Sequence, residues 1–193
     1  MADITGTYEL GPGAGRVLVK TGREGLAARA GHDLTLEITQ WSARVTLPGD
    51  AAAASLTAEL DLGSLAVREG TGGAKPLTDR DRRDIQAQAV KILGGAKASF
   101  ASARAIPAYA GTPSSGWPGN GAIEGTLTLG GTARPLRLQV ISVAPGEYRG
   151  SATVLQTDFG ITPYSGFFGA LKLKNEVTVE FEVKISGIPN VGA

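Results

Sequence analysis

The chain has 193 residues, with 19 basic and 18 acidic side chains, one histidine and no cysteine. This length predicts a single domain over residues 1–193 that can bury a sizeable core. Without cysteine there is no disulfide and no thiolate site, and His32 alone cannot build a multi-histidine metal site, so we expect no metal centre. A net charge of +1 excludes the broad basic surface of a nucleic-acid-binding protein.

Residues 1–16 lack the basic segment and following apolar run of a secretory signal. No segment approaches the roughly 20 consecutive apolar residues that a membrane span needs. We therefore expect a cytoplasmic protein without a transmembrane segment.

In the first half of the chain, the alternation of apolar and polar residues predicts β-strands with one apolar, buried face. The pattern runs through residues 16–21, 34–39 and 56–62. It also runs from Trp41 to Leu47, but there the apolar positions are shifted by one residue relative to those of 34–39. Because a shift of one residue reverses the face of a strand, we predict a bulge or sharp bend near Gln40. Such bends allow a sheet to curl into a barrel.

Residues 78–93 break this period and predict one α-helix. Their apolar side chains recur at helical spacing on a narrow stripe, formed by Ile85, Ala89, Ile92 and Leu93. Thr78 is suited to cap the first turn, and Gly94 with Gly95 is suited to end the last. We expect the helix to lie across a rim or flank of the sheet, where it would cover an opening.

Alternation resumes after the helix at residues 96–100, 123–129 and 136–140, and the last two predict a hairpin across the GGTARP turn. Between them, residues 105–121 contain three prolines and four glycines without periodicity, which indicates a long loop. Trp117 in this loop is expected either to pack onto the barrel or to form an exposed contact.

The segment 147–186 places two alternating strands on either side of an aromatic, glycine-rich connection. In the closing strand one face is apolar, with Val177, Val179, Phe181, Val183 and Ile185. The connection holds Phe159, Tyr164, Phe167 and Phe168. These aromatic side chains either pack in the core, or form a ligand-lining hinge or an exposed entrance to a cavity.

Three segments carry a resemblance to a known family: GTYELGPGAGRVLVKTGREG at the start, GTLTLGGTARPLRLQV at 125–140, and TDFGI followed by NEVTVEFEVKIS. The middle segment fits the family hairpin pattern G-x-L-T-x-x-G-x-x-x-P through Gly125, Leu127, Thr128, Gly131 and Pro135. The DFG element is Asp158, Phe159 and Gly160. In this order, the segments resemble those of YceI-like proteins, which are associated with the binding of polyisoprenoids.

The resemblance implies a mainly β fold: an antiparallel lipocalin-like β-barrel of about eight strands with one α-helix at about 78–93. It also implies an apolar channel for an isoprenoid tail, such as that of a quinone or polyprenyl phosphate. A barrel of this size is either filled by side chains or holds a small ligand. Small residues at inward positions favour the second outcome: Ala58, Ala96, Ala98, Gly125 and Ala152.

Inward positions and the aromatic connection together predict the ligand contacts. They are Leu36, Ile38, Phe100, Leu127, Leu138, Val154, Phe159, Tyr164, Phe167, Phe168, Val179 and Phe181. For a polar head group we predict His32, Arg80 and Arg83, because arginine suits phosphate geometry and histidine can act as a contact or a pH-sensitive latch. The alternatives are a solvated helix face for the arginines and a structural, hydrogen-bonded role for His32.

Three functions follow from these residues. The first is non-enzymatic transport or sequestration of a long apolar lipid, which would be a ligand and not a cofactor, with no catalytic residue. The second is a protein-interaction module with a filled barrel and an exposed patch of Trp117 and Phe167–Phe168. The third is a lipid-handling enzyme, which would need His32 or paired carboxylates facing the cavity. A homodimer and a transient contact with a membrane surface are compatible with each.

Overall fold

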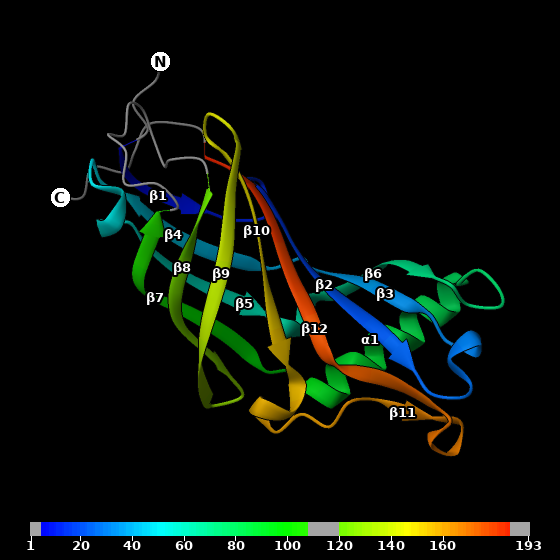
Figure 1. The fold of residues 1–193 in the computed structure, drawn as a ribbon. Helices are drawn as coiled ribbons and strands as arrows, with labels where there is room; N and C mark the ends of the chain where they lie inside the picture. Colours follow the sequence, from blue (N-terminus) through cyan, green and yellow to red (C-terminus); the bar gives the residue numbers. More distant parts are fainter. Residues whose placement is uncertain (1–4, 108–119, 186–193) are drawn as a thin grey trace.

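The computed structural model describes residues 5–107 and 120–185, and within them the chain is mainly β with one α-helix (Figure 1). The strands are β1 (Gly6–Leu10), β2 (Gly15–Glu24), β3 (Asp33–Ile38), β4 (Trp41–Leu47), β5 (Ser55–Asp61), β6 (Leu65–Thr71), β7 (Lys97–Pro107), β8 (Asn120–Leu129), β9 (Thr132–Ala144), β10 (Glu147–Leu155), β11 (Ser165–Gly166) and β12 (Leu171–Lys184). The helix is α1 (Asp79–Leu93). Short 3₁₀ turns are η1 (Ala28–Ala30), η2 (Ala51–Ala53), η3 (Leu62–Ser64), η4 (Gln156–Phe159) and η5 (Phe167–Gly169).

All these strands belong to one antiparallel sheet with the order β1-β4-β5-β7-β8-β9-β10-β12-β2-β3-β6, and β11 pairs with β12. The sheet curls because β3 continues into β4 and β5 continues into β6. If each of these bent pairs is counted as one long strand and β1 and β11 are set apart, eight strands follow one another around the barrel. The predicted count of about eight therefore describes the barrel, although the sheet is divided into 12 strands.

Hydrogen bonds carry the sheet through the bend between β3 and β4. The Thr39 amide and hydroxyl donate to the Ser64 carbonyl over 3.4 and 2.8 Å. The Asp61 amide donates to the Gln40 carbonyl over 3.0 Å. Because both partners turn together, Ile38 and Trp41 point inward on either side of the corner and both are buried. The bend predicted near Gln40 is confirmed.

The helix α1 has the predicted bounds and caps. The Thr78 hydroxyl accepts a hydrogen bond from the Asp81 amide, and the Asp81 carboxylate accepts one from the Thr78 amide. Hydrogen bonds from Thr78 hold the pKa of Asp81 below its ordinary value. Gly94 ends the helix in the left-handed conformation, with φ of 63°, which glycine adopts without steric cost.

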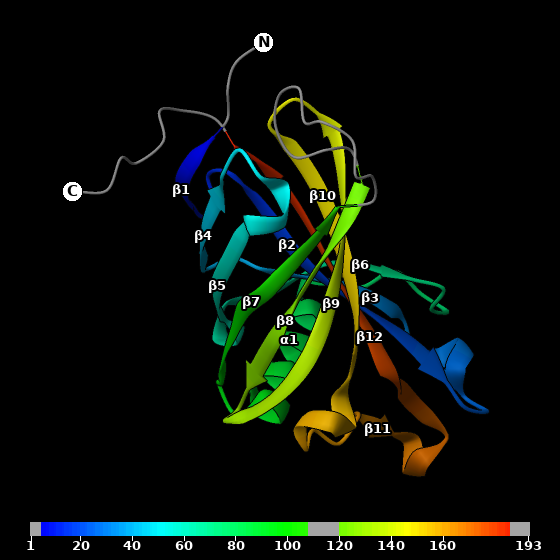
Figure 2. The same ribbon diagram turned by 60° about the vertical axis from the view of Figure 1, so that its left-hand side comes forward.

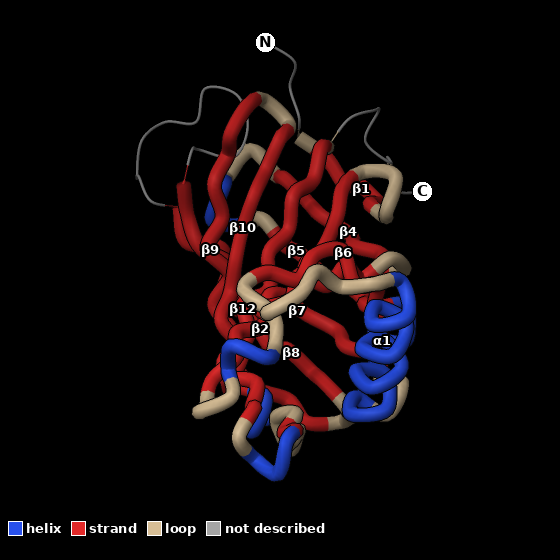
Figure 3. Tube along the Cα trace, turned by 90° about the vertical axis from the view of Figure 1, so that its right-hand side faces the viewer, coloured by secondary structure: helices blue, strands red, loops and turns tan. Residues whose placement is uncertain are grey.

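The helix lies along the free edge of β6, on the opposite flank from β9 and β10 (Figure 3). Arg82 donates from Nη1 to the carbonyls of Val67 and Arg68, over 3.3 and 2.8 Å, and so covers edge groups that lack a strand partner. After α1 the chain returns along β7 and β8, and Figure 2 shows the helix behind these two strands.

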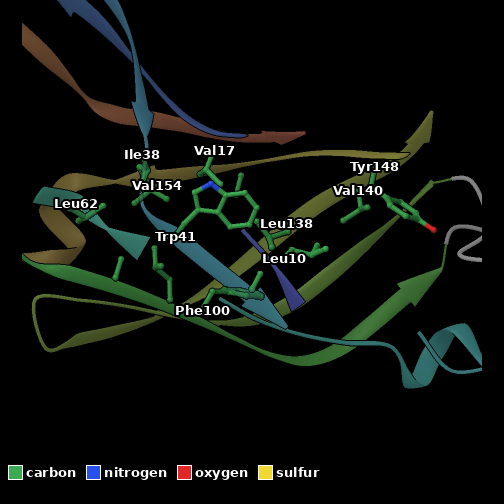
Figure 4. Close-up of a cluster of buried hydrophobic side chains, with 14 of the residues drawn as sticks. Leu10, Val17, Ile38, Trp41, Leu62, Phe100, Leu138, Val140, Tyr148 and Val154 are labelled. Carbon is green, nitrogen blue, oxygen red and sulfur yellow. The ribbon is translucent and has the colours of Figure 1, made fainter. Parts of the chain in front are cut away.

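Successive side chains of a strand point to opposite faces, so the barrel has an apolar inner face and a charged outer face. Ion pairs between neighbouring strands lie on the outer face, such as Arg16 with Glu182 and Arg104 with Glu124. Hydrogen bonding from Arg104 lowers the pKa of Glu124. The core is a cluster of buried side chains around Trp41, drawn in Figure 4.

Some strands differ from those predicted. The β8–β9 hairpin is confirmed, but its turn is only Gly130–Gly131, both with positive φ, as a tight two-residue hairpin requires. The predicted loop at 105–121 is too long, because β7 extends to Pro107 and β8 begins at Asn120. Strands β1 and β6 were not predicted, and Trp117 lies outside the described residues.

Candidate functional site: the apolar cavity

The barrel encloses a cavity of about 290 Å³. Side chains from β1 to β10, from β12 and from α1 contribute to its wall. This volume is close to the lower end of the range of about 300–1,000 Å³ for small-molecule sites. The cavity is therefore large enough to consider as a binding site for part of an apolar molecule.

Nine of the twelve ligand contacts predicted from the sequence line the cavity: Leu36, Ile38, Phe100, Leu127, Leu138, Val154, Tyr164, Val179 and Phe181. All except Tyr164 lie at inward positions of strands. The aliphatic and aromatic character of the wall is shared by residues that were not predicted, among them Trp41 and Leu62. Figure 4 shows Trp41 between Ile38, Val17 and Leu138.

The other three predicted contacts lie outside the lining. Phe159 is partly buried and packs against the core cluster, so it supports the wall from behind. Phe167 and Phe168 are exposed on the turn η5. Of the two interpretations of the aromatic connection, core packing fits Phe159, while the pair at η5 neither packs in the core nor lines the cavity.

Two glycines allow aromatic rings to lie flat on the barrel wall. A Cβ atom at Gly125 would lie 2.5 Å from Cζ of Phe100, and one at Gly150 would lie 2.3 Å from Cε1 of Phe181. Both rings also line the cavity. Because each ring occupies the place of a missing side chain, it covers the wall without filling the interior.

We expect Gly150→Ala to push the Phe181 ring inward and to lower the free energy of unfolding by about 1–3 kcal/mol, as overpacking does. The added Cβ would also lie 2.5 Å from the Gln139 carbonyl oxygen, so the backbone must shift. Urea unfolding measures the change. Gly49→Ala is the control, because no atom lies within 4 Å of the added methyl group; equal stability of the two variants would contradict this packing.

The helix closes one side of the cavity with its last turns. Ala89, Ile92 and Leu93 line the wall, and Ile85 packs against the core beside them. These four residues form the stripe predicted from the sequence. The helix therefore covers the part of the barrel where β6 and β7 are not paired with each other.

Thr21, Gln156 and Tyr164 line the cavity from neighbouring segments of the chain, and we call their part of the cavity the polar end. Ser55 also belongs to the lining. The Gln156 amide donates to the Lys174 carbonyl over 2.9 Å, and the Tyr164 carbonyl accepts from the Leu173 amide over 2.9 Å. The Thr21 hydroxyl is buried and has no hydrogen-bond partner among the described residues. Buried polar groups are normally paired, so the Thr21 hydroxyl would gain a partner from a ligand if the side chain turned toward the cavity.

An irregular stretch of β12 shapes this polar end. The pairing of β12 with β2 shifts register between Leu173 and Val177. Asn175 in the shifted stretch accepts from the Thr157 amide and donates to the Thr157 hydroxyl, over 2.9 and 2.8 Å. These bonds fix η4 to the strand. Sequence reasoning missed Thr21 and Gln156, because their placement depends on this contact between distant segments.

The predicted head-group residues lie away from the cavity lining. His32 shares a hydrogen bond of 2.8 Å between its Nε2 and the Lys75 carbonyl oxygen, which fits the structural alternative. Arg80 is exposed and lies 3.7 Å from a carboxylate oxygen of Asp84. Arg83 is also exposed. Both arginines occupy the first turns of α1, whereas the last turns face the cavity.

Among the residues that the structure describes, no carboxylate, histidine, lysine or arginine lines the cavity. Over residues 5–107 and 120–185, no three histidine or acidic side chains lie close enough together to hold a metal ion. In the same ranges no helix has the length and apolar character to cross a membrane.

Together these features define a lipocalin-like β-barrel with an apolar interior, one polar end and a helix on its flank. The family model of the YceI-like domain matches residues 16–185. The chain therefore belongs to the YceI-like family. No curated protein matches its sequence.

The solved structures similar to this chain include those of two bacterial proteins. Burkholderia cenocepacia BcnA shares 17% identity with a TM-score of 0.59, over 88% of this chain and 96% of that chain. The Campylobacter jejuni YCEI protein shares 14% identity with a TM-score of 0.46, over 79% of this chain and 85% of that chain. At these identities, the likeness to BcnA establishes a common fold.

Proposed function

We propose that this protein binds a long apolar lipid of the isoprenoid type inside the barrel and transports or sequesters it without chemical change. The observation that carries the proposal is the cavity itself, which is lined by apolar side chains from the whole sheet and has its unpaired hydroxyl, Thr21, at one end. Family membership supports the same function, because YceI-like proteins are associated with polyisoprenoid binding.

The energetics favour a hydrocarbon chain over a polar ligand. Each CH₂ group that moves from water to an apolar wall contributes about 0.8 kcal/mol, so a few prenyl units supply useful affinity without polar contacts. Charged groups would pay a large desolvation cost in such a wall. The ligand class is therefore a long chain with one small polar group: the neutral head group of a quinone fits the interior, whereas the charged head group of a polyprenyl phosphate would have to stay outside it.

The polar group of the ligand is expected at the end formed by Thr21, Gln156 and Tyr164. A quinone carbonyl placed there would accept a hydrogen bond from the Thr21 hydroxyl, and the chain would extend toward Trp41. This orientation replaces the head-group site first predicted at His32, Arg80 and Arg83, since none of those three side chains lines the cavity.

Thr21→Val tests this orientation. Valine has almost the same shape and lacks the unpaired hydroxyl, so the free energy of unfolding without ligand is expected to rise by about 1 kcal/mol. Affinity for a prenyl quinone is expected to fall by up to about tenfold, the value of one neutral hydrogen bond, while affinity for squalene is unchanged. Denaturant unfolding and fluorescence titration measure the two effects; an equal change for both ligands would contradict the orientation.

Trp41 provides a direct test of binding in the cavity. The chain has two tryptophans, so Trp117→Phe leaves Trp41, in the cavity wall, as the sole tryptophan reporter. Addition of a prenyl quinone is expected to quench its fluorescence in a saturable manner at one ligand per chain. If quenching is linear with concentration, or occurs equally with the free amino acid, the proposal fails.

The two alternative functions have less support. An interaction module with a filled barrel does not fit an interior that holds a cavity, although the exposed pair Phe167–Phe168 retains a role in the next subsection. A lipid-handling enzyme would need an acid or base at the cavity, and none of the described lining residues is a histidine, carboxylate or lysine. The cytoplasmic location and a homodimer stay predictions, which cell fractionation and analytical ultracentrifugation would test.

A further inference from the structure

Three large apolar side chains project from one end of the barrel. Leu26, Phe167 and Phe168 are 101%, 64% and 112% exposed, and we call them the apolar tip. The turn η5, which carries the two phenylalanines, lies beyond β11 at the end of the molecule far from β1 (Figure 1). Single exposed apolar residues are common on protein surfaces, but three with this exposure on adjacent turns are not.

The two turns of the apolar tip are fixed to each other. The Ala27 amide donates to the Ala170 carbonyl over 2.9 Å. Gly25 approaches the same carbonyl so closely that a Cβ atom would lie 2.4 Å from its oxygen. Leu26 and the turn η5 therefore belong to one local structure, although about 140 residues separate them in the sequence.

The backbone of η5 is strained in a way that exposes the aromatic rings. Phe167 and Phe168 have φ values of 50° and 55°, and they are the only non-glycine residues with positive φ among those described. Bulky side chains rarely adopt this conformation. Neither ring belongs to the buried core or to the partly buried side chains packed against it, so core packing does not offset the strain. Strain retained without an internal benefit points to a function outside the chain.

The surroundings of the apolar tip carry unpaired cations. Arg29, Lys172 and Lys174 have no ion-pair partner among the residues described. Lys172 is the nearest to the rings, since its Cε lies 4.0 Å from the place of a Cβ atom on Gly169. Glu24 lies opposite Lys172 on the paired strands β2 and β12 but forms no ion pair with it. The local excess of positive charge is therefore modest.

We propose that the apolar tip is a membrane anchor that inserts into the interface of an anionic lipid bilayer. Protruding aromatic and aliphatic side chains beside cations suit this interface, where rings enter the acyl boundary and lysines meet the head groups. A membrane is favoured over a protein partner because the three side chains stand out from the surface, and insertion into a bilayer needs no matching cavity on a partner.

The apolar tip lies near the polar end of the cavity, which connects membrane binding to lipid exchange. Tyr164 lines the polar end of the cavity and lies directly before β11. Insertion of the apolar tip would therefore bring this end of the barrel to the membrane surface, where a lipid can enter or leave. This role rests on the proposed function, whereas membrane insertion itself does not.

Sedimentation with vesicles tests the anchor in the full chain. The wild type is expected to bind vesicles of phosphatidylcholine with phosphatidylglycerol more strongly than vesicles of phosphatidylcholine alone. Phe167→Asn with Phe168→Asn should lower the partition coefficient by about tenfold or more, because two apolar rings no longer leave water. Asparagine tolerates positive φ, so the thermal midpoint of this variant should stay the same or rise.

A matched control replaces exposed apolar residues elsewhere. Ile141 and Val143 on β9 are each 48% exposed, and their replacement by asparagine should leave vesicle binding unchanged. Equal loss in both variants, or no binding by the wild type, overturns the proposal. Self-association that depends on Phe167 and Phe168, without vesicle binding, would assign the apolar tip to a second copy and also overturn it.

Failure of the anchor can be separated from failure of the cavity. The variant with asparagine at 167 and 168 should still show saturable quenching of Trp41 by a prenyl quinone in solution. If the wild type binds vesicles through the tip but shows no such quenching, the cavity function fails and the anchor stands. If quenching is normal and vesicle binding is absent, the anchor fails and the cavity function stands.

Discussion

Replacement of Leu127 by aspartate is expected to lower the free energy of unfolding by about 3–5 kcal/mol and to abolish lipid binding. Leu127 is buried on the inner face of β8 and lines the cavity. The carboxylate would face an apolar wall that offers no cation and no hydrogen-bond donor near it. Thermal or urea unfolding and Trp41 quenching measure the two losses, which should occur together.

The neighbouring residue provides the control for this variant. Thr126 precedes Leu127 on β8 and is exposed on the outer face. Thr126→Asp should change the free energy of unfolding by less than about 1 kcal/mol and leave binding intact. If Leu127→Asp were as stable as Thr126→Asp, Leu127 would not face the interior and the assigned inner face of β8 would be wrong.

Replacement of Ala58 by phenylalanine is expected to abolish binding in the opposite way, by filling the cavity. Ala58 lies in the lining between Ala43 on β4 and Phe100 on β7. The new ring would occupy space that the ligand needs, so affinity for a prenyl quinone should fall by more than about tenfold. The free energy gained by burying the apolar ring and the cost of overpacking nearly cancel. The free energy of unfolding should therefore stay within about 1 kcal/mol of the wild-type value.

The same substitution on the outer face controls for the added ring. Ala101 lies on β7 with its side chain exposed, and Ala101→Phe should retain the affinity of the wild type. If Ala58→Phe loses binding but keeps its stability, the loss cannot result from unfolding. Leu127→Asp alone could not show this, because that variant is expected to lose stability and binding together. Retained binding in Ala58→Phe would mean that the ligand does not occupy the cavity.

The barrel could be predicted from the sequence because its strands are long and alternate strictly. In β12, Val179 and Phe181 share a face by spacing alone, and both line the cavity. The corner at Gln40 was also predictable, since the apolar phase changes there. Strands β1 and β6 were missed because each pairs with a single neighbour and few of their residues alternate.

The polar end of the cavity could not be predicted in the same way. Thr21 continues the alternation of β2, and nothing near it in the sequence distinguishes a buried hydroxyl from an exposed one. Its surroundings are set by η4 and by the shifted stretch of β12, which lie more than 130 residues further along the chain. Sequence reasoning placed the head group on arginines instead, because their charge is visible without knowledge of these contacts.

Aromatic content misled the prediction for the turn η5. Phe167 and Phe168 were predicted as ligand contacts because aromatic side chains are usually buried. Gly166 and Gly169 on either side were a signal of unusual backbone, and the positive φ values of the two phenylalanines direct them outward. Exposure here was decided by local conformation and not by hydrophobicity.

Native mass spectrometry of the protein, purified gently from its host without detergent, tests the central claim most directly. We predict a population with one bound molecule per chain, whose mass and fragmentation identify a prenyl chain with a small polar group, and which the Ala58→Phe variant lacks. Protein that carries no lipid, and that also fails to take up added prenyl quinone or polyprenyl phosphate in a saturable manner, would contradict it.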